Sequence, residues 1–363
     1  MTYREIAKQL NISPATLSLV LNSKPGISEA TRQRVLNGVE ELGLSHLIRA
    51  GTEGTAPAGN LGLVIFKRNG SILDRHSFFL LLMESLEGQA QRNGYGLLLS
   101  NVDCRNALAP QLVRLNDMDI QGAVIFATEM TASDLDCLAG LRYPFVLMDN
   151  DFTLLNVDTV AINNEMGTYQ AVAHLVKLGY RRIGYLKCSE RISSFREREL
   201  GYRRALQSFG LVLEPLDILE VRYSEEGSYL DFKRLFSETR ELPRAFVTDD
   251  DTIVSGFVRA LLEFGIRVPQ DISVVGFNNR PSCELFSPPL TSVDVPKHSF
   301  GAEAVDMLVQ LIKKHQEGGQ HNRYGRALKL RICTKLVERQ STRSLGIGES
   351  ETILVGRQLS VYS

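Results

Sequence analysis

The spacing of apolar residues changes once along this chain of 363 residues. Residues 2–42 carry apolar side chains three or four positions apart, which is the pattern of amphipathic helices. Residues 51–59 are rich in Gly, Thr and Ala, a composition typical of a linker. After this linker, short apolar runs alternate with amphipathic stretches of helical length. The sequence therefore predicts a small all-α unit joined to a much larger α/β unit.

Three short helices are expected in the N-terminal unit. Thr2 and Glu5 have the spacing of a capping box, and Ser13 and Ser28 stand where the second and third helices would begin. Pro14 suits the first helical position, because its missing N–H would have no partner there. A helix, a tight turn and a second helix are typical of a helix-turn-helix. A three-helix protein-binding bundle would show the same spacing, so both alternatives stay open at this point.

The larger unit is expected to contain parallel, doubly wound sheets with right-handed crossovers, because predicted strands and helices alternate along it. Ten strands are many for one twisted sheet, so we expect two α/β lobes. Ligands of such sheets bind at the carboxyl ends of the strands, and a cleft between the lobes would bring these ends together. The predicted strands are 61–66, 95–99, 123–126, 145–148, 160–162, 183–186, 218–221, 245–247, 272–277 and 290–295. The predicted helices include 78–92, 166–178, 199–209, 253–264 and 300–314.

Composition excludes several classes of protein. Hydrophobic residues make up 44% of the chain and charged residues 23%, which excludes wholesale disorder. No apolar run approaches the roughly 20 residues of a membrane span, and five scattered cysteines without a Cys-x-x-Cys pair favour a reducing compartment. The six histidines show no metal-ligand spacing, and no catalytic motif or nucleotide-binding loop is present. We therefore expect a cytoplasmic protein with no membrane partner that is not an enzyme and holds no metal or cofactor.

Charge gives only a weak indication of a nucleic-acid partner. The formal net charge of the whole chain is −1 at pH 7. The first 50 residues hold six Lys and Arg against four Asp and Glu, so this unit is slightly basic and the remainder slightly acidic. With so few cations to face phosphates, we expect modest non-specific DNA affinity and a shallow dependence on salt.

The first 43 residues resemble the headpiece of the lac/gal repressor family. The matching segments are 2–8 (TYREIAK), 12–22 (ISPATLSLVLN), 27–35 (ISEATRQRV) and 40–43 (EELG). The resemblance implies a transcriptional regulator, with the nucleoid as its place in the cell. It also implies a homodimer that binds a near-palindromic DNA operator through two headpieces. The residues expected at the DNA are Arg4, Pro14, Ala15, Thr16, Ser18, Leu19, Asn22, Lys24 and Thr31.

Two features of this headpiece depart from the family pattern. Leu19 stands where the family usually carries Arg or His, and leucine cannot make a bidentate contact with guanine. We therefore expect an operator half-site that depends more on contact with thymine methyl groups. Leu47 and Ile48 are the expected hinge residues that would wedge into the minor groove, but the usual Arg-Pro-Asn and Ala-Arg-x-Leu order is absent.

The resemblance continues to about residue 342 and implies a two-lobed periplasmic-binding-protein-like domain with a small-molecule effector, most commonly a sugar, in its cleft. The segments that carry it are 77–79, 94–101, 174–184, 198–206, 245–251, 272–279, 288–293 and 336–342. An Arg fork would donate to the ligand, carboxylates would accept from its hydroxyls, and aromatic rings would cover its apolar face. Asn163 and Asn278 replace acids that the family usually has, so the identity of the effector stays open. The expected effector contacts are Phe78, Phe79, Asp149, Arg198, Tyr223, Asp250 and Asn278.

The expected domains are a helix-turn-helix headpiece (1–46), a hinge and linker (47–59), a two-lobed effector-binding and dimerisation domain (60–342) and a C-terminal tail (343–363). The tail has no leucine heptad, so we expect no tetramerising coiled coil. Two alternatives stay open. A regulator of the same fold could be controlled by a phosphocarrier protein of the HPr type, with a vestigial cleft. A sugar-binding module without DNA function would have the same two-lobe plan.

Overall fold

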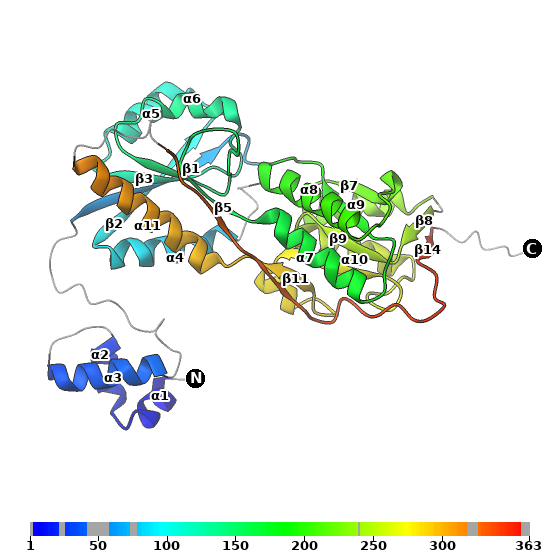
Figure 1. Ribbon diagram of the computed structural model, residues 1–363, viewed down its shortest axis with the longest axis horizontal. Coiled ribbons are helices and arrows are strands. Elements are labelled where there is room, and N and C mark those ends of the chain that lie inside the picture. Colours follow the sequence, from blue (N-terminus) through cyan, green and yellow to red (C-terminus); the bar gives the residue numbers. More distant parts are fainter. Residues whose placement is uncertain are drawn as a thin grey trace, which may run out of the picture.

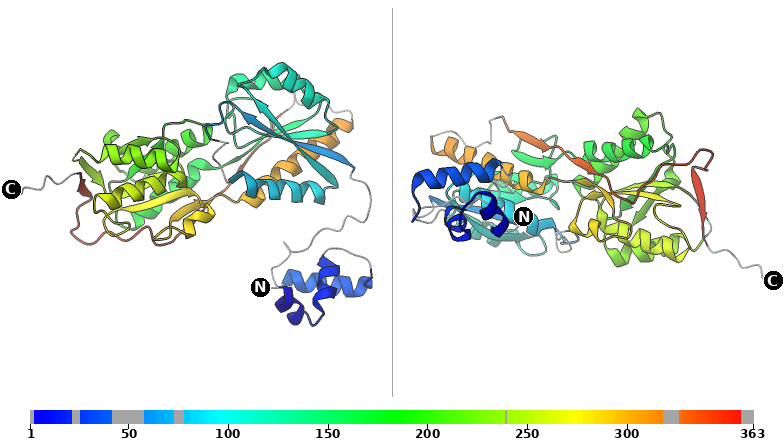
Figure 2. Two further views of the ribbon diagram at one scale, coloured as in Figure 1. Left: turned by 180° about the vertical axis from the view of Figure 1, so that it is seen from behind. Right: turned by 90° about the horizontal axis from the view of Figure 1, so that it is seen from below.

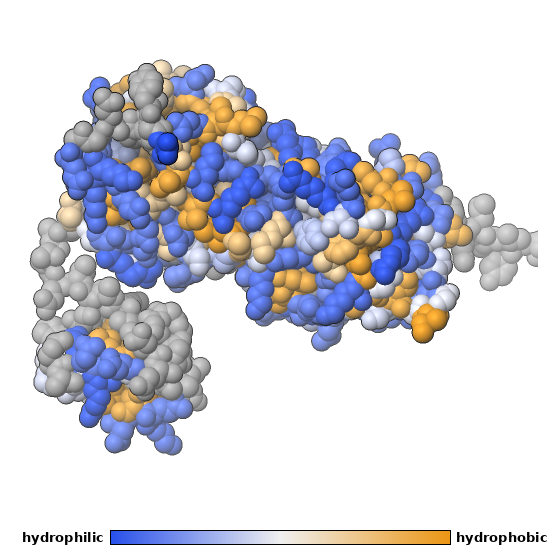
Figure 3. All heavy atoms as spheres, viewed as in Figure 1, coloured by the Kyte–Doolittle hydropathy of each residue, from blue (hydrophilic) through white to orange (hydrophobic). Residues whose placement is uncertain are grey.

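The computed structural model describes residues 3–21, 26–41, 58–72, 78–238, 240–317 and 326–356. It contains a helical headpiece and an elongated body of two α/β lobes (Figure 1). On the face seen in Figure 3, hydrophilic residues are interspersed with small hydrophobic areas. Within the described residues, we find no helix that combines the length and the apolar character of a membrane span.

The headpiece contains the three predicted helices, α1 (Tyr3–Gln9), α2 (Pro14–Leu21) and α3 (Glu29–Glu41). Ser13 Oγ accepts the Thr16 amide at 2.9 Å, so the predicted N-cap of α2 is confirmed. Ser28 Oγ accepts the Thr31 amide at 3.3 Å at the start of α3. The apolar stripes of the three helices meet in one small core: Ile6, Ala7, Leu17, Val20, Leu21, Val35 and Val39.

The N-terminal lobe is a parallel six-stranded sheet in the order β12-β5-β4-β3-β1-β2. Its core residues place α4 and α11 on one face of the sheet and α5 and α6 on the other. The strands are β1 (Gly59–Lys67), β2 (Tyr95–Asp103), β3 (Gly122–Phe126), β4 (Phe145–Met148), β5 (Thr159–Ile162) and β12 (Lys329–Ile332). The helices are α4 (Phe78–Arg92), α5 (Leu108–Asn116), η3 (Ala132–Asp134), α6 (Leu135–Leu138) and α11 (Lys297–Gln316).

The C-terminal lobe repeats this plan with a sheet in the order β13-β11-β10-β9-β6-β7, in which β13 alone of the described strands is antiparallel to its neighbour. Helices α7 and α8 cover one face, and α9 and α10 cover the other. The strands are β6 (Gly184–Cys188), β7 (Ile218–Val221), β9 (Ala245–Thr248), β10 (Ser273–Asn278), β11 (Thr291–Asp294) and β13 (Lys335–Val337). The helices are α7 (Asn164–Lys177), α8 (Ser193–Ser208), η4 (Pro215–Asp217), α9 (Glu225–Leu235), α10 (Asp251–Glu263) and η5 (Pro281–Glu284).

The chain crosses between the lobes three times, after β5, after β11 and after β12. The last crossing is the orange-to-red segment that runs along the body from one lobe to the other (Figure 2, right). Short crossings of this kind form a hinge, because few backbone torsions need to change when one lobe moves as a unit. The two-lobe prediction is confirmed, and each of the ten predicted strands overlaps an observed one.

Four short strands were not predicted: β8 (Arg240–Pro243), β12, β13 and β14 (Thr352–Val355). Strand β14 pairs antiparallel with β8, and Val355 is buried in the core of the C-terminal lobe. The segment 343–356, which sequence analysis assigned to a tail, is therefore built onto this lobe.

Candidate DNA-binding surface and effector cleft

Helix α2 presents the predicted DNA-facing residues on its outer side. Pro14 and Ala15 are exposed, and Thr16, Ser18 and Leu19 are partly exposed. The opposite side of the helix, Leu17, Val20 and Leu21, is buried in the headpiece core. The helix can therefore meet another surface without disturbing its packing, as the recognition helix of a helix-turn-helix must.

The remaining headpiece predictions are less fully described. Thr31 is partly exposed in the first turn of α3, where its hydroxyl lies 2.8 Å from Ser28 Oγ. Asn22, Lys24, Leu47 and Ile48 lie outside the described residues, as does the side chain of Arg4. Their expected contacts with DNA stay predictions.

Arg198 is fixed inside the C-terminal lobe by three different partners. It lies in α8 and is only 4% exposed. Its guanidinium donates to Asn164 Oδ1 at 2.9 Å, to the Asp249 carbonyl at 2.5 Å and to Asn278 Oδ1 at 3.3 Å. It also lies over the Phe277 ring, 3.8 Å from the centroid. The planar fork is therefore held in one orientation before any ligand arrives.

Asp250, Asn278 and Tyr223, three of the residues expected to contact the effector, join the same network. Asn278 Nδ2 donates to Asp250 Oδ2 at 2.5 Å, and Asp250 Oδ1 caps α10 by accepting the Thr252 amide at 2.8 Å. Tyr223 is fully buried. Burial is the main cause that raises its pKa, and the nearby Asp250 carboxylate raises it further.

Arg280 is a member of this network that sequence analysis missed. Its Nη2 atom lies 3.1 Å from Asp250 Oδ1 and donates to the Tyr223 hydroxyl at 2.8 Å. We expected the Asp250 carboxylate to accept hydrogen bonds from ligand hydroxyls. Its oxygen atoms are instead largely paired with groups of its own lobe. In the sequence, Arg280 stands out only as an Arg two positions after Asn278, the last residue of β10. An Arg in such a position is usually solvated.

Asp149 belongs to the other lobe, at the end of β4. It has a left-handed φ of 72° and accepts the Thr128 hydroxyl at 2.6 Å. Burial raises its pKa to about 6, while the Thr128 hydrogen bond and the charge of Arg198 act in the opposite direction. This influence of Arg198 joins the two lobes electrostatically. Phe78 and Phe79 begin α4, and their side chains lie outside the described residues.

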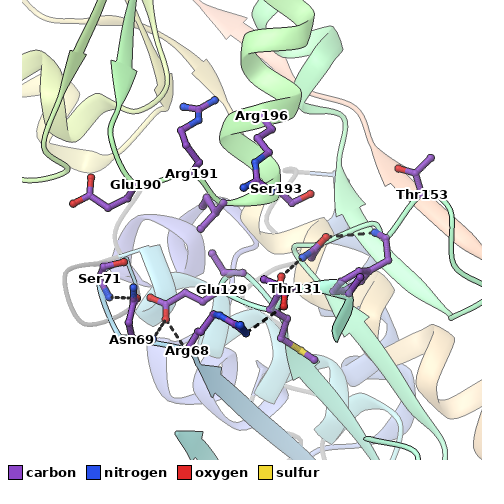
Figure 4. A pocket seen from close by; sticks show the side chains of 16 residues that line it. Arg68, Asn69, Ser71, Glu129, Thr131, Thr153, Glu190, Arg191, Ser193 and Arg196 are labelled. Atoms are coloured by element: carbon purple, nitrogen blue, oxygen red, sulfur yellow. Dashed lines mark hydrogen bonds between the residues drawn. The ribbon is translucent and has the colours of Figure 1, made fainter. Parts of the chain in front are cut away.

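A cavity of about 440 Å³ opens between the lobes (Figure 4). Asp149, Arg198, Tyr223, Asp250 and Asn278 are not among the described residues that line it. In Figure 4, Arg68, Asn69, Ser71, Glu129 and Thr131 of the N-terminal lobe lie on one side of the cavity, and Glu190, Arg191, Ser193 and Arg196 lie on the other. Its charged and hydroxyl-bearing walls are Arg68, Ser71, Thr128, Glu129, Thr131, Thr153, Glu190, Arg191, Ser193 and Arg196.

Each wall of this cavity is organised by a buried carboxylate. Glu129 accepts the backbone amides of Arg68, Asn69, Gly70 and Ile72 at 2.9–3.1 Å. On the other wall Asp249 accepts Arg191 Nη1 at 2.5 Å. Burial raises the pKa of Asp249 to about 6, and the Arg191 charge opposes this shift. Neither the Glu129 clamp nor the Arg191–Asp249 pair could be expected from sequence spacing. Within the described residues, no group of three His, Cys, Asp or Glu side chains is arranged to hold a metal ion.

Comparison with known proteins agrees with the two parts of this fold. Residues 2–45 match the model for bacterial regulatory proteins of the lacI family, and residues 172–342 match that for a periplasmic binding protein-like domain. The chain belongs to the lacI family of bacterial regulatory proteins. This lacI-family chain is a DNA-binding transcriptional repressor with an effector-binding domain, and not an enzyme.

Relatives of known name are similar over nearly the whole chain. The HTH-type transcriptional repressor PurR of Haemophilus influenzae (strain PittEE) is 27% identical over 346 residues, which cover 95% of this chain and 99% of PurR. The ribose operon repressor of Haemophilus influenzae is 29% identical over 318 residues, which cover 87% of this chain and 93% of that repressor.

Solved structures share the fold at lower identity. A lac repressor dimer bound to operator and the anti-inducer ONPF superposes with a TM-score of 0.65 at 22% identity, covering 94% of this chain and 99% of that one. A complex of the transcriptional regulator CelR with cellobiose has a TM-score of 0.66 at 21% identity, with coverage of 94% and 99%. These likenesses support the two-lobed lacI-family fold.

Proposed function

We propose that this repressor binds a near-palindromic operator as a homodimer and that a sugar in the cleft between the lobes controls it. The observation that carries the proposal is Arg198, which is buried and held by three partners inside the C-terminal lobe. The ribose operon repressor supports a sugar as the effector, since its name ties it to ribose and it is 29% identical to this chain.

The chemistry of the cleft suits a ligand with many hydroxyl groups. Arg198 has five N–H groups, and its contacts with the described residues use three of them. Asp149 supplies a carboxylate from the opposite lobe, where only the Thr128 hydroxyl donates to it among the described residues. A hydroxyl group is both donor and acceptor, so a sugar can satisfy both sides.

Titration calorimetry with ribose, cellobiose and nucleosides tests the effector. We expect heat from at least one sugar, and we expect that sugar to change operator affinity. If no ligand gives heat while phosphorylated HPr changes operator affinity, control by a phosphocarrier protein replaces the sugar. No contact among the described residues specifically favours this alternative. Binding of sugar without any operator would instead indicate a sugar-binding module.

The operator itself can be tested through Leu19. Selection from random duplex DNA should enrich two inverted half-sites, because two headpieces bind in a homodimer. The half-sites should contain thymines whose methyl groups face α2, and a Leu19→Arg variant should enrich guanine at the position that Leu19 faces. An invariant guanine that is lost only when Leu19 is changed to Ala would contradict this prediction. Sedimentation equilibrium measures the dimer directly.

A further inference from the structure

A second pocket opens on the N-terminal lobe, and its walls are mainly apolar. It lies between α6, the start of β4 and the segment that leads into β5. Its volume of about 360 Å³ is in the range of small-molecule sites. Leu138 and Leu141 are buried in the core on this face of the sheet, so part of the wall is fixed by packing. The apolar side chains that line the pocket are Leu135, Leu138, Leu141, Phe145, Leu155 and Val157.

The polar side chains at this pocket are two carboxylates and one amide, and no described lining residue carries a positive charge. Asn156 Oδ1 accepts the Ala327 amide at 3.0 Å. Asp158 Oδ1 accepts the Leu328 amide at 2.8 Å, so the segment before β12 holds this side of the pocket in place. Asp136 is exposed in α6. An anionic ligand would be repelled by these carboxylates, whereas an apolar molecule that is neutral or carries an amine suits them.

Two loops form walls of both this pocket and the cavity between the lobes. The loop that follows β3 lines the cavity with residues 128–132 and the pocket from Ala132 onward. The loop that follows β4 lines the cavity as far as Thr153 and the pocket with residues 155–158. Among the described residues, Ala132 alone lines both. The two sites therefore lie back to back on the same two loops.

We propose that this apolar pocket is a second ligand site, which takes a small ring-containing molecule that is neutral or cationic. The site goes beyond the effector proposed above, because its lining is apolar and almost entirely separate from that of the cavity. A ligand in the pocket would contact both shared loops. It would therefore restrain the loop residues that face the cavity, because ordering one part of a short loop limits the motion of the rest.

Fluorescence titration with N-phenyl-1-naphthylamine tests the site. This probe is uncharged and holds two ring systems on one N–H group, and the chain contains no tryptophan that would interfere. We expect saturable binding at a single site. The matched probe 8-anilinonaphthalene-1-sulfonate has the same rings and an added sulfonate, so we expect it to bind this site roughly tenfold more weakly. Absence of saturable naphthylamine binding would overturn the site, and equal affinity for the sulfonate would overturn the ligand class.

Two neighbouring leucines provide a variant and its control. Leu155 lines the pocket and is 37% exposed, so Leu155→Gln makes the wall polar without opening a core. We expect it to weaken naphthylamine binding roughly tenfold. Leu154 is 96% exposed and is not among the lining residues, so Leu154→Gln should bind as the unchanged chain does. Equal affinities for the two variants, each with native circular dichroism, would overturn the site.

The acidic rim is tested by charge reversal. We expect Asp136→Lys to strengthen binding of the sulfonate probe roughly tenfold, because a cation then replaces the repelling carboxylate. Binding of the neutral naphthylamine should change little. An unchanged affinity for the sulfonate would overturn the role of Asp136 in selecting the ligand.

Hydrogen exchange followed by mass spectrometry tests the shared loops. We expect the naphthylamine to slow amide exchange in residues 155–158 and also in residues 128–131 and 150–153, which belong to the cavity side of the loops. Leu155→Gln should show no slowing at the same probe concentration, and Leu154→Gln should show the full effect. Slowing confined to residues 155–158 would overturn the link between the two sites.

Discussion

The two lobes hold the predicted effector residues differently, and on neither lobe do these residues line the described cavity. On the C-terminal lobe, Arg198, Asn278, Asp250, Arg280 and Tyr223 form one continuous network of hydrogen bonds and an ion pair. On the N-terminal lobe, Asp149 has one described hydrogen-bond donor, Thr128. The network of the C-terminal lobe is fixed by contacts within that lobe. Asp149, by contrast, contributes a carboxylate from the opposite lobe.

This difference suggests how the lobes divide the work of binding. A preorganised network loses little conformational freedom when a ligand arrives, so the C-terminal face should supply most of the affinity and selectivity. The N-terminal face contributes the carboxylate of Asp149, whose pKa is lowered by the charge of Arg198 in the other lobe. It should therefore report on whether the cleft is open or closed.

Breaking the buried ion pair of the C-terminal face should have the largest effect. We expect Arg280→Leu to lower the free energy of unfolding by about 3–5 kcal/mol, because it leaves Asp250 charged and buried without its cation. Denaturant unfolding followed by circular dichroism measures this loss.

Arg259 is a suitable control for that measurement. Arg259→Leu breaks an exposed pair with Glu226 and should cost at most about 1 kcal/mol. If the two variants lose equal and small amounts of stability, the C-terminal face is not the rigid element that the comparison requires.

Asp149 on the N-terminal face should give a smaller, pH-dependent effect. Its pKa in the folded protein, about 6, lies above its ordinary value of 3.8. The folded state therefore favours the protonated carboxyl, and this group loses stabilising effect as pH rises from about 4 through 6. Asp149→Asn does not titrate, so its stability relative to the unchanged chain should rise by about 2 kcal/mol across this window. A difference that does not vary with pH would contradict the assignment.

The smallest expected effect concerns the hydroxyl that faces Asp149. Thr128→Val keeps the shape of the side chain and removes its 2.6 Å hydrogen bond, which should cost about 1 kcal/mol at neutral pH. Because this hydrogen bond lowers the pKa of Asp149, the variant should raise that pKa further. Carbon-13 NMR titration of the Asp149 carboxyl measures the change. An unchanged pKa would mean that the hydroxyl does not stabilise the charged form.

The sheets could largely be predicted, because their central strands are buried on both faces and appear as continuous apolar runs. Two of the missed strands, β12 and β13, lack that signal. Lys329 and Arg331 in β12 and Lys335 in β13 give these strands a mixed polar sequence, and they lie at sheet edges. Their positions depend on pairing with distant strands, which no local pattern records.

The cleft could be predicted only in part. Arg198, Asp250 and Asn278 follow family motifs, and the structure joins them in one hydrogen-bonded network, although they do not line the described cavity. Arg280 and Glu129 have residue types that are ordinary at a surface, and both are buried by segments far away in the sequence. Their roles arise from tertiary packing, and no spacing in the chain points to them.

Operator affinity with and without sugar, compared between the unchanged chain and Arg198→Ala, tests the central claim most directly. Fluorescence anisotropy of labelled operator DNA should show that the sugar which shifts affinity in the unchanged chain has no effect on Arg198→Ala, although both bind operator alone equally well. Arg203→Ala, an exposed change on the same helix, should respond normally. A full response of Arg198→Ala at the same sugar concentration would contradict the account, because effector recognition would then lie elsewhere.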